Sequence, residues 1–280
     1  MGLYKKEKRE TELGLHADLV IKEVQLIRKR QPKIGVRKLQ VKLYSTMKRH
    51  GIKIGRDGLF DLLREFDMLV KQKRFKHYST NSRHPFYKYP NLIKTLRLAK
   101  PGQLWVSDIT YIEVAGRFYY LFLITDACSK KIVGYKLSEN YSVNGALEAL
   151  HMALKENKTR EGLIHHSDRG IQYCCLQYTA LLKKKSIKIS MTENSDPYEN
   201  AIAERVNGIL KTELLASKYD DAASAFKSVK QAIKIYNYER PHMSIELLTP
   251  MQAHKLSTIM KPLWSKKNYA RRKSYNNKIL

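Results

Sequence analysis

The chain has 280 residues, of which 43% are hydrophobic, so it is long enough for two modest domains with a sizeable core. Its 53 Lys and Arg residues exceed its 26 Asp and Glu residues and give a formal net charge of +27. This excess favours a nucleic-acid partner, because each phosphate that Lys or Arg neutralises releases condensed counterions. No apolar run approaches the roughly 20 residues of a membrane-spanning helix, and the N-terminal segment has no hydrophobic signal region. We therefore expect a cytoplasmic protein that does not bind membrane.

The first seventy residues predict three short basic helices. Residues 1–17 are charged and are expected to fray. Apolar residues then recur at helical spacing in three segments, which are Ala17 to Pro32, Val36 to Met47 and Leu59 to Phe66. Three such helices suit a helix-turn-helix domain over residues 1–70.

Arg56 and Arg64 would lie near the DNA-reading helix of this domain. The alternative is a small helical bundle with solvated charges. Gly55 and Gly58 weaken the start of the third helix. The sequence therefore does not decide which residues would contact the bases. Residues 71–97 form a basic linker that either lies along DNA, with aromatic rings available for stacking, or packs on its neighbour.

Residues 98–257 alternate predicted strands with predicted helices. The first three strands are expected over residues 104–114, 117–127 and 131–140, and their short turns require an antiparallel meander. An apolar stripe from Val143 to Leu154 predicts a helix. A strand ending at Asp168, a helix around residues 174–184, a strand over residues 187–192 and two further helices follow.

Three carboxylates in this part of the chain are unusual. Asp108 lies in the middle of a hydrophobic strand, where a charge needs a partner or a purpose. Asp168 follows a short apolar run, as at a strand end. Glu204 lies on a helix face apart from the apolar stripe, with Lys211 seven positions later. Hard cations such as Mg²⁺ take oxygen ligands, so we expect these carboxylates to meet and hold a divalent metal. A surface Glu–Lys helix is the alternative for Glu204.

The residues around these carboxylates resemble a known family. The segments SDIT, HHSDRGIQY and NAIAERVNGILKTE, with 35 residues between Asp168 and Glu204, are similar to the DDE transposases of the retroviral integrase superfamily. In detail they resemble the integrase-core subunit (orfB-type) of the insertion sequence 3 family, which the second of two overlapping frames encodes. YNYERPH at residues 236–242 and the later Thr249-Pro250 also match.

The resemblance implies an α/β fold. The expected core is a ribonuclease-H-like (integrase catalytic core) mixed sheet with flanking helices, preceded by the small all-α helix-turn-helix domain. In that fold Asp108 and Asp168 lie on adjacent strands, so both carboxylates can reach one site.

The resemblance also implies a metal-dependent transposase that cleaves the 3′ ends of an insertion sequence and joins them to target DNA. Asp108, Asp168 and Glu204 would be catalytic and would hold two Mg²⁺ or Mn²⁺ ions, which stabilise the attacking and leaving oxygens of a phosphoryl transfer. The expected DNA-contacting residues of the core are Lys211, Arg205, Arg169 and Arg240. The alternatives are a DNA-binding regulator without activity of its own, or a nuclease of the same fold.

The implied partners are double-stranded DNA, as terminal inverted repeats and as target, and further copies of the chain in a synaptic complex. The third implied partner is the upstream-frame product, either as a separate protein or fused to this chain by frameshifting. The resemblance therefore implies a bacterial protein that associates with the nucleoid. The basic tail at residues 258–280 is either a flexible DNA-contacting arm or a solubilising end.

Several residues near the predicted site have two interpretations. Asp126, near a strand end, is either an accessory ligand or, more commonly, a turn cap. His165 and His166 either assist catalysis or, more commonly, are structural. Asp196-Pro197 resembles the start of the helix that carries Glu204. The three cysteines, at positions 128, 174 and 175, include no Cys-x-x-Cys pair, so we expect them to pack as small apolar residues.

Overall fold

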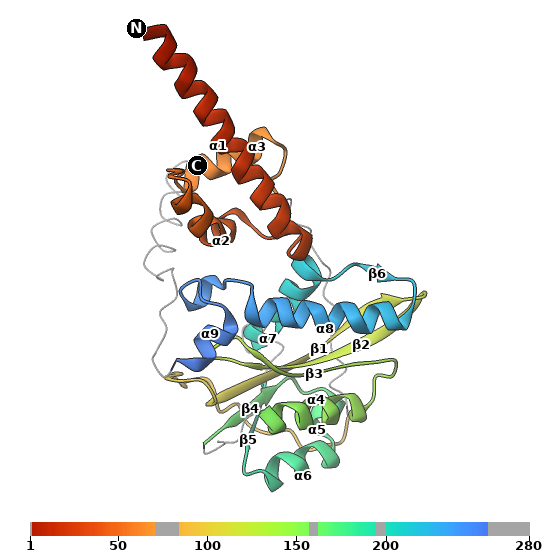
Figure 1. Cartoon of the computed structure of the whole chain (residues 1–280). Helices are drawn as coiled ribbons and strands as arrows, with labels where there is room; N and C mark the ends of the chain where they lie inside the picture. Colours follow the sequence, from red (N-terminus) through yellow and green to blue (C-terminus); the bar gives the residue numbers. More distant parts are fainter. Residues whose placement is uncertain (1, 71–83, 157–161, 194–199, 257–280) are drawn as a thin grey trace, which may run out of the picture. The chain divides into compact units, whose positions relative to one another are not determined.

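The structure, a computed structural model, describes residues 2–70, 84–156, 162–193 and 200–256 (Figure 1). Its contacts divide the chain into two compact units, one of residues 1–75 with Thr212–Leu214 and one of residues 76–211 with 215–280. The predicted tail, the start of the predicted linker and the predicted Asp196 cap lie outside the described residues, and the predicted domain boundaries stay predictions. Within the described residues, no helix is both long and apolar enough to cross a membrane.

The first unit packs α1 (Gly2–Arg30), α2 (Val36–Arg49) and α3 (Arg56–Glu65) around one apolar core. Helix α1 begins at Gly2, so the prediction of a frayed segment before Ala17 is wrong; its Lys and Glu residues favour helix. Gly51, at φ +65°, ends α2 in the left-handed conformation that glycine adopts without strain.

The two glycines that were expected to weaken α3 do not delay it. Gly55 is the extended residue that precedes the helix, and Gly58 lies within its first turn. Three helices in this order are compatible with the predicted helix-turn-helix, whose binding to DNA stays a prediction.

The second unit is built on a mixed sheet of strand order β3-β2-β1-β4-β5 (Figure 1). Strands β1 (Leu104–Val114), β2 (Arg117–Asp126) and β3 (Ile132–Ser138) form the predicted antiparallel meander. Strands β4 (Ile164–Ser167) and β5 (Lys188–Met191) run parallel to β1. This confirms the ribonuclease-H-like arrangement and places β1 beside β4.

Helices cover both faces of this sheet. Helices α4 (Val143–Glu156), α5 (Ile171–Cys174) and α6 (Leu176–Lys184) lie on one face, and α7 (Ala201–Ile209) and α8 (Ala222–Tyr238) lie on the other (Figure 1). A short helix α9 (Pro250–Lys255) follows. The predicted helix at residues 174–184 begins only after Cys175, whose extended backbone separates α5 from α6.

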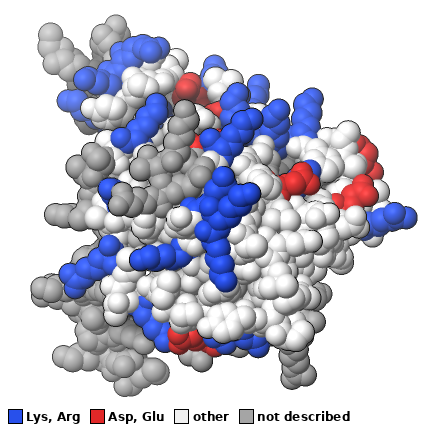
Figure 2. All heavy atoms as spheres, turned by 90° about the horizontal axis from the view of Figure 1, so that it is seen from below, with Lys and Arg blue, Asp and Glu red and all other residues white. Residues whose placement is uncertain are grey.

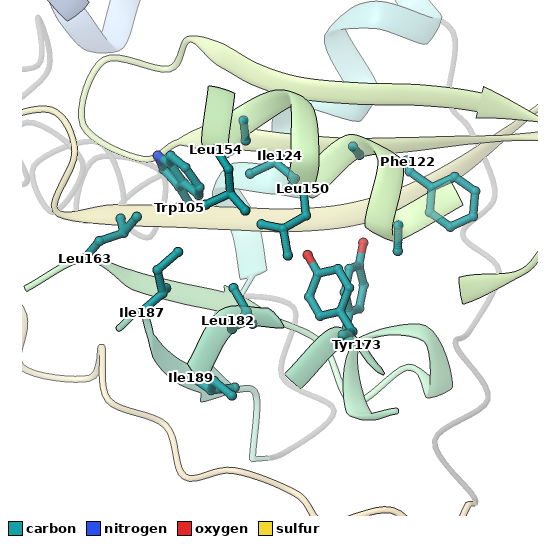
Figure 3. Packing of buried hydrophobic residues seen from close by; sticks show 14 of the residues in the cluster. Trp105, Phe122, Ile124, Leu150, Leu154, Leu163, Tyr173, Leu182, Ile187 and Ile189 are labelled. Carbon is teal, nitrogen blue, oxygen red and sulfur yellow. The ribbon is translucent and has the colours of Figure 1, made fainter. Parts of the chain in front are cut away.

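The larger core fills the space between the sheet and the first group of helices. Trp105 and Phe122 from the sheet meet Leu150 of α4 and Leu182 of α6 there (Figure 3). Helix α4 lies so close to β3 that a Cβ added at Gly134 would be 2.1 Å from the carbonyl oxygen of Ala149. The absence of a side chain at Gly134 therefore permits this packing.

One edge of β1 is open in the middle, and this gap positions the site. Strand β4 pairs only with Leu104–Val106, and β6 (Lys218–Tyr219) pairs only with Glu113 and Val114. Among the described strands, none pairs with β1 between these points on that side. Asp108 lies in this gap.

Candidate active site

Asp108 is half-buried at the open edge of β1, and both of its carboxylate oxygens accept hydrogen bonds. Oδ1 accepts from the backbone N–H of Ile109 at 2.9 Å, and Oδ2 accepts from Nδ2 of Asn207 at 2.7 Å. Burial raises the pKa of Asp108 to about 7, the negative charge of Asp168 adds to this, and Glu204 contributes least; the two hydrogen bonds oppose the shift. Without a cation, Asp108 is therefore a carboxylate that resists ionisation at neutral pH.

Asp168 follows directly after β4, as the sequence predicted. Its Oδ1 accepts a hydrogen bond from the backbone N–H of Gly170 at 3.1 Å, at the start of α5. Its charge also raises the pKa values of Tyr141 and Tyr173, after the larger effect of burial on each. Asp168, Asp108 and these two tyrosines therefore surround one region of the molecule.

Glu204 lies half-buried in the first turn of α7, and its charge reaches Asp108. The three carboxylates do not form a ready-made ligand cluster. Over the described parts of the chain, no three His, Cys, Asp or Glu side chains are grouped as metal ligands. The predicted metal site is therefore a region of converging negative charge, and its ligand set stays a prediction.

Asn207 is a site residue that the sequence analysis missed. It lies one helical turn after Glu204 on α7, is buried, and donates to Asp108 across the space between α7 and β1. Its Oδ1 has no hydrogen-bond partner among the described residues. The i+3 spacing from Glu204 could have indicated it, because residues at that spacing share a helix face.

Lys211 lies near the carboxylates in a π-helical turn, Leu210–Leu214, that continues α7. Its Nζ lies 4.0 Å from the centre of the Tyr111 ring, a close cation–π contact that the sequence did not reveal. Burial lowers the pKa of Lys211, and the charge of Asp108 opposes that shift. Arg205, also on α7, is exposed.

The remaining predicted DNA-contacting arginines occupy different environments. Arg56 and Arg64 are exposed in the first unit, where each pairs with a neighbouring aspartate of α3. Arg169 is half-buried, and its guanidinium donates to the carbonyl oxygen of Glu193 at 2.9 Å. Arg240 is only 3% exposed and donates to the carbonyl of Pro241; this burial disfavours contact with DNA, which stays a prediction. Its stem and guanidinium pack inside the unit.

Both histidines before Asp168 are buried and structural, which is the commoner of the two interpretations. Nε2 of His165 lies 2.7 Å from Oγ of Ser107 and 2.9 Å from the hydroxyl of Tyr178, and burial lowers the pKa of His165 to about 3. Nδ1 of His166 lies 2.8 Å from Oγ of Ser190. These contacts join β4 to β1, α6 and β5.

Asp126 is a turn cap and not an accessory ligand. It is fully buried, and it accepts hydrogen bonds from the backbone N–H of Gly102 and from both the N–H and the hydroxyl of Ser129. Cys174 and Cys175 are buried free thiols, as predicted, and Cys128 is partly buried.

Positive charge dominates the surface of the protein that Figure 2 displays. Lys and Arg side chains outnumber Asp and Glu side chains on this face. The excess agrees with the net charge of the whole chain and favours a polyanionic partner.

Comparisons with known proteins give consistent results. Residues 99–197 and 185–250 match two family models, each described as an integrase core domain. The chain is 36% identical to the insertion element IS600 uncharacterized 31 kDa protein of Shigella sonnei, over 77% of this chain and 79% of that protein. It is 31% identical to the transposase for insertion sequence element IS629 of Shigella sonnei, over 72% and 67%.

A solved structure was also matched. The catalytic core domain of HTLV-2 integrase in complex with magnesium is 18% identical in sequence and has a TM-score of 0.44. The match covers 55% of this chain and 97% of that one.

Proposed function

This chain belongs to the DDE transposases of the retroviral integrase superfamily, and on that premise we propose that it cleaves DNA at the 3′ ends of an insertion sequence and joins them to target DNA. The observation that best supports the proposal is the environment of Asp108. Its carboxylate lies at an open strand edge, where burial first, and then the charges of Asp168 and Glu204, disfavour its ionisation. Such a site gains most from binding a cation.

The donor set fits a hard divalent cation. Asp108, Asp168 and Glu204 offer only carboxylate oxygens, which Mg²⁺ and Mn²⁺ prefer. We propose that these three residues hold two such ions, which when bound stabilise the charge on the attacking and leaving oxygens of the phosphodiester. Asn207 holds Asp108 by donating to Oδ2, so the orientation of the carboxylate is set before a ligand arrives.

The cations of α7 and the turn after it would bind the DNA backbone. Lys211 is half-buried beside Asp108, where its ammonium can neutralise a phosphate next to the scissile bond. Arg205 is exposed and can contact a more distant phosphate. The exposed Arg56 and Arg64 of α3 would bind the terminal repeat. We propose that two or more copies act together, either alone or with the upstream-frame product.

A strand-transfer assay tests this function. A labelled duplex that carries the repeat flanking the gene is incubated with target DNA and Mg²⁺, and the wild type is compared with Glu204→Gln. Glu148→Gln is the matched control, because Glu148 is an exposed glutamate of α4 that pairs with Lys136 of β3.

The expected result is joined product with the wild type and with Glu148→Gln, and a loss of at least a hundredfold with Glu204→Gln. Equal joining by Glu204→Gln would exclude the carboxylate site. Binding without cleavage by every variant would favour a DNA-binding regulator or a requirement for the upstream-frame product. Cleavage without joining of a pre-cut end would indicate a nuclease.

A further inference from the structure

Four aromatic side chains line one face of the β1–β2 ribbon beside the candidate site. Tyr111 and Tyr120 are direct cross-strand partners, which places both side chains on the same face of the sheet. Phe118 meets Tyr111 edge-on, with ring centres 4.9 Å apart, and Tyr141 meets Tyr120 at the same distance. We call Phe118, Tyr111, Tyr120 and Tyr141 the aromatic strip.

The two ends of the aromatic strip are open to solvent. Phe118 is 56% exposed and Tyr141 is 44% exposed, whereas Tyr111 and Tyr120 are half-buried between them. Large exposed aromatic rings are costly to leave in water and are common where a ligand covers them. The backbone carbonyl of Tyr141 accepts a hydrogen bond from Nε2 of Gln172, which holds the end of the strip near α5.

One end of the aromatic strip lies within the electrostatic reach of the carboxylates, and its middle lies beside a cation. The charges of Asp168 and Asp108 act on the hydroxyl of Tyr141, so that ring borders the candidate site. At the other side, Nζ of Lys211 lies 4.0 Å over the ring of Tyr111. Aromatic rings beside a cation and next to a phosphoryl-transfer site are the components from which binding sites for single-stranded nucleic acid are built.

We propose that the aromatic strip is a stacking site for the unpaired nucleotides that flank the scissile phosphate. The base faces of a duplex are hidden in its own stack, so only nucleotides that have left the duplex can lie on these rings. Lys211 then contacts the phosphodiester between the stacked bases. The identity of this ligand as DNA rests on the proposed function.

Fluorescence of a base analogue tests this stacking directly. The probe is a DNA duplex with a three-nucleotide single-stranded 3′ overhang that contains 2-aminopurine, whose fluorescence falls when it stacks on an aromatic ring. Binding is measured without divalent metal, so that no cleavage occurs. The variants are Tyr141→Ala and Phe118→Ala, with Tyr141→Phe as the conservative replacement and Tyr238→Ala, a 55% exposed tyrosine of α8, as the control.

Stacking predicts a specific pattern in these variants. Wild type, Tyr141→Phe and Tyr238→Ala quench the probe, whereas Tyr141→Ala and Phe118→Ala bind the overhang about tenfold more weakly and quench it less. Affinity for a blunt duplex stays unchanged in all of them. Because the exposed rings carry little of the core, thermal unfolding is expected to stay within a few degrees of the wild type.

The outcomes separate this proposal from the proposed function. Equal quenching by wild type and Tyr141→Ala overturns the stacking site, even if strand transfer proceeds. Ring-dependent quenching by a wild type that neither cleaves nor joins DNA supports the stacking site and leaves the proposed function to a regulator or to a requirement for the upstream-frame product. Absence of quenching overturns the stacking site whether or not cleavage occurs.

Discussion

Replacing Asp108 by Asn should stabilise the metal-free protein. The pKa of Asp108 rises from 3.8 to about 7, chiefly by burial. A rise of about three pKa units, at about 1.4 kcal/mol for each unit, means that ionisation of this carboxylate lowers the stability of the folded protein by about 4 kcal/mol. Asn can keep both hydrogen bonds, because the amide of Asn207 can turn and offer its Oδ1, which now lacks a partner.

The sign of this effect fixes its dependence on pH. The folded-state pKa of Asp108 lies above the unfolded-state value, so the folded protein binds the extra proton. The contribution of protonated Asp108 to the stability of the fold is therefore fully present below about pH 4 and is lost as the pH rises towards 7. The gain from Asp108→Asn should be about 1–2 kcal/mol at pH 5 and about 4 kcal/mol at pH 8.

Urea unfolding, followed by circular dichroism in the presence of a chelator, measures the gain at both pH values. Asp126→Asn is a control of opposite sign, because Asp126 accepts three hydrogen bonds and its replacement should cost about 1–3 kcal/mol. Mg²⁺ should then stabilise the wild type and leave Asp108→Asn unchanged. A gain that is equal at pH 5 and pH 8, or a less stable Asp108→Asn at pH 8, would refute the reasoning.

Three further outcomes follow from buried groups. In Asp108→Asn, the free energy of unfolding should fall by about 2–3 kcal/mol from pH 6 to pH 4, because the pKa of buried His165 is about 3 and only the unfolded state takes up that proton. In the wild type the titration of Asp108 offsets this loss, and urea unfolding at both pH values compares the two proteins. Gly134→Ala places a methyl group 2.1 Å from a carbonyl oxygen of α4 and should lower stability by about 2 kcal/mol, whereas Gly208→Ala, with open space at its Cβ, should raise it by about 0.5 kcal/mol in the same assay. Asn237→Asp removes the donor to a buried carbonyl of β3 and should lower the melting temperature at neutral pH. A thermal scan in which the variant unfolds at the wild-type temperature would contradict this prediction.

The sequence was sufficient to predict the meander and the places of Asp108 within β1 and of Asp168 directly after β4, because both features leave local signals. Apolar alternation and short turns at Gly116 and Ser129 fix three antiparallel strands. A carboxylate such as Asp108 in an otherwise apolar strand departs from the pattern and is visible without a structure. The break at Cys175 leaves no such signal, because its extended backbone is set by packing between two helices.

The remainder of the site depends on contacts between distant segments. Asn207 is an ordinary polar residue on a helix, and only the approach of α7 to β1 makes it a partner of Asp108. Lys211 lies at the start of a π-helical turn, and only the approach of this turn to β1 brings its ammonium over the ring of Tyr111. Regular helical spacing therefore predicted the neighbourhood of Lys211 but not its partner.

The motif that contains the buried Arg240 contributes to the packing of the fold. Tyr236 of the same motif is fully buried, and Asn237 both donates to the carbonyl of Ile132 and accepts from its N–H, at 2.9 Å each. Nδ1 of His242 lies 2.8 Å from Oγ of Ser244, two residues along the chain. Asn237 therefore ties α8 to β3, and the contact of His242 is local. Since α8 lies on the same face of the sheet as α7, this part of the motif supports the layer that carries Glu204.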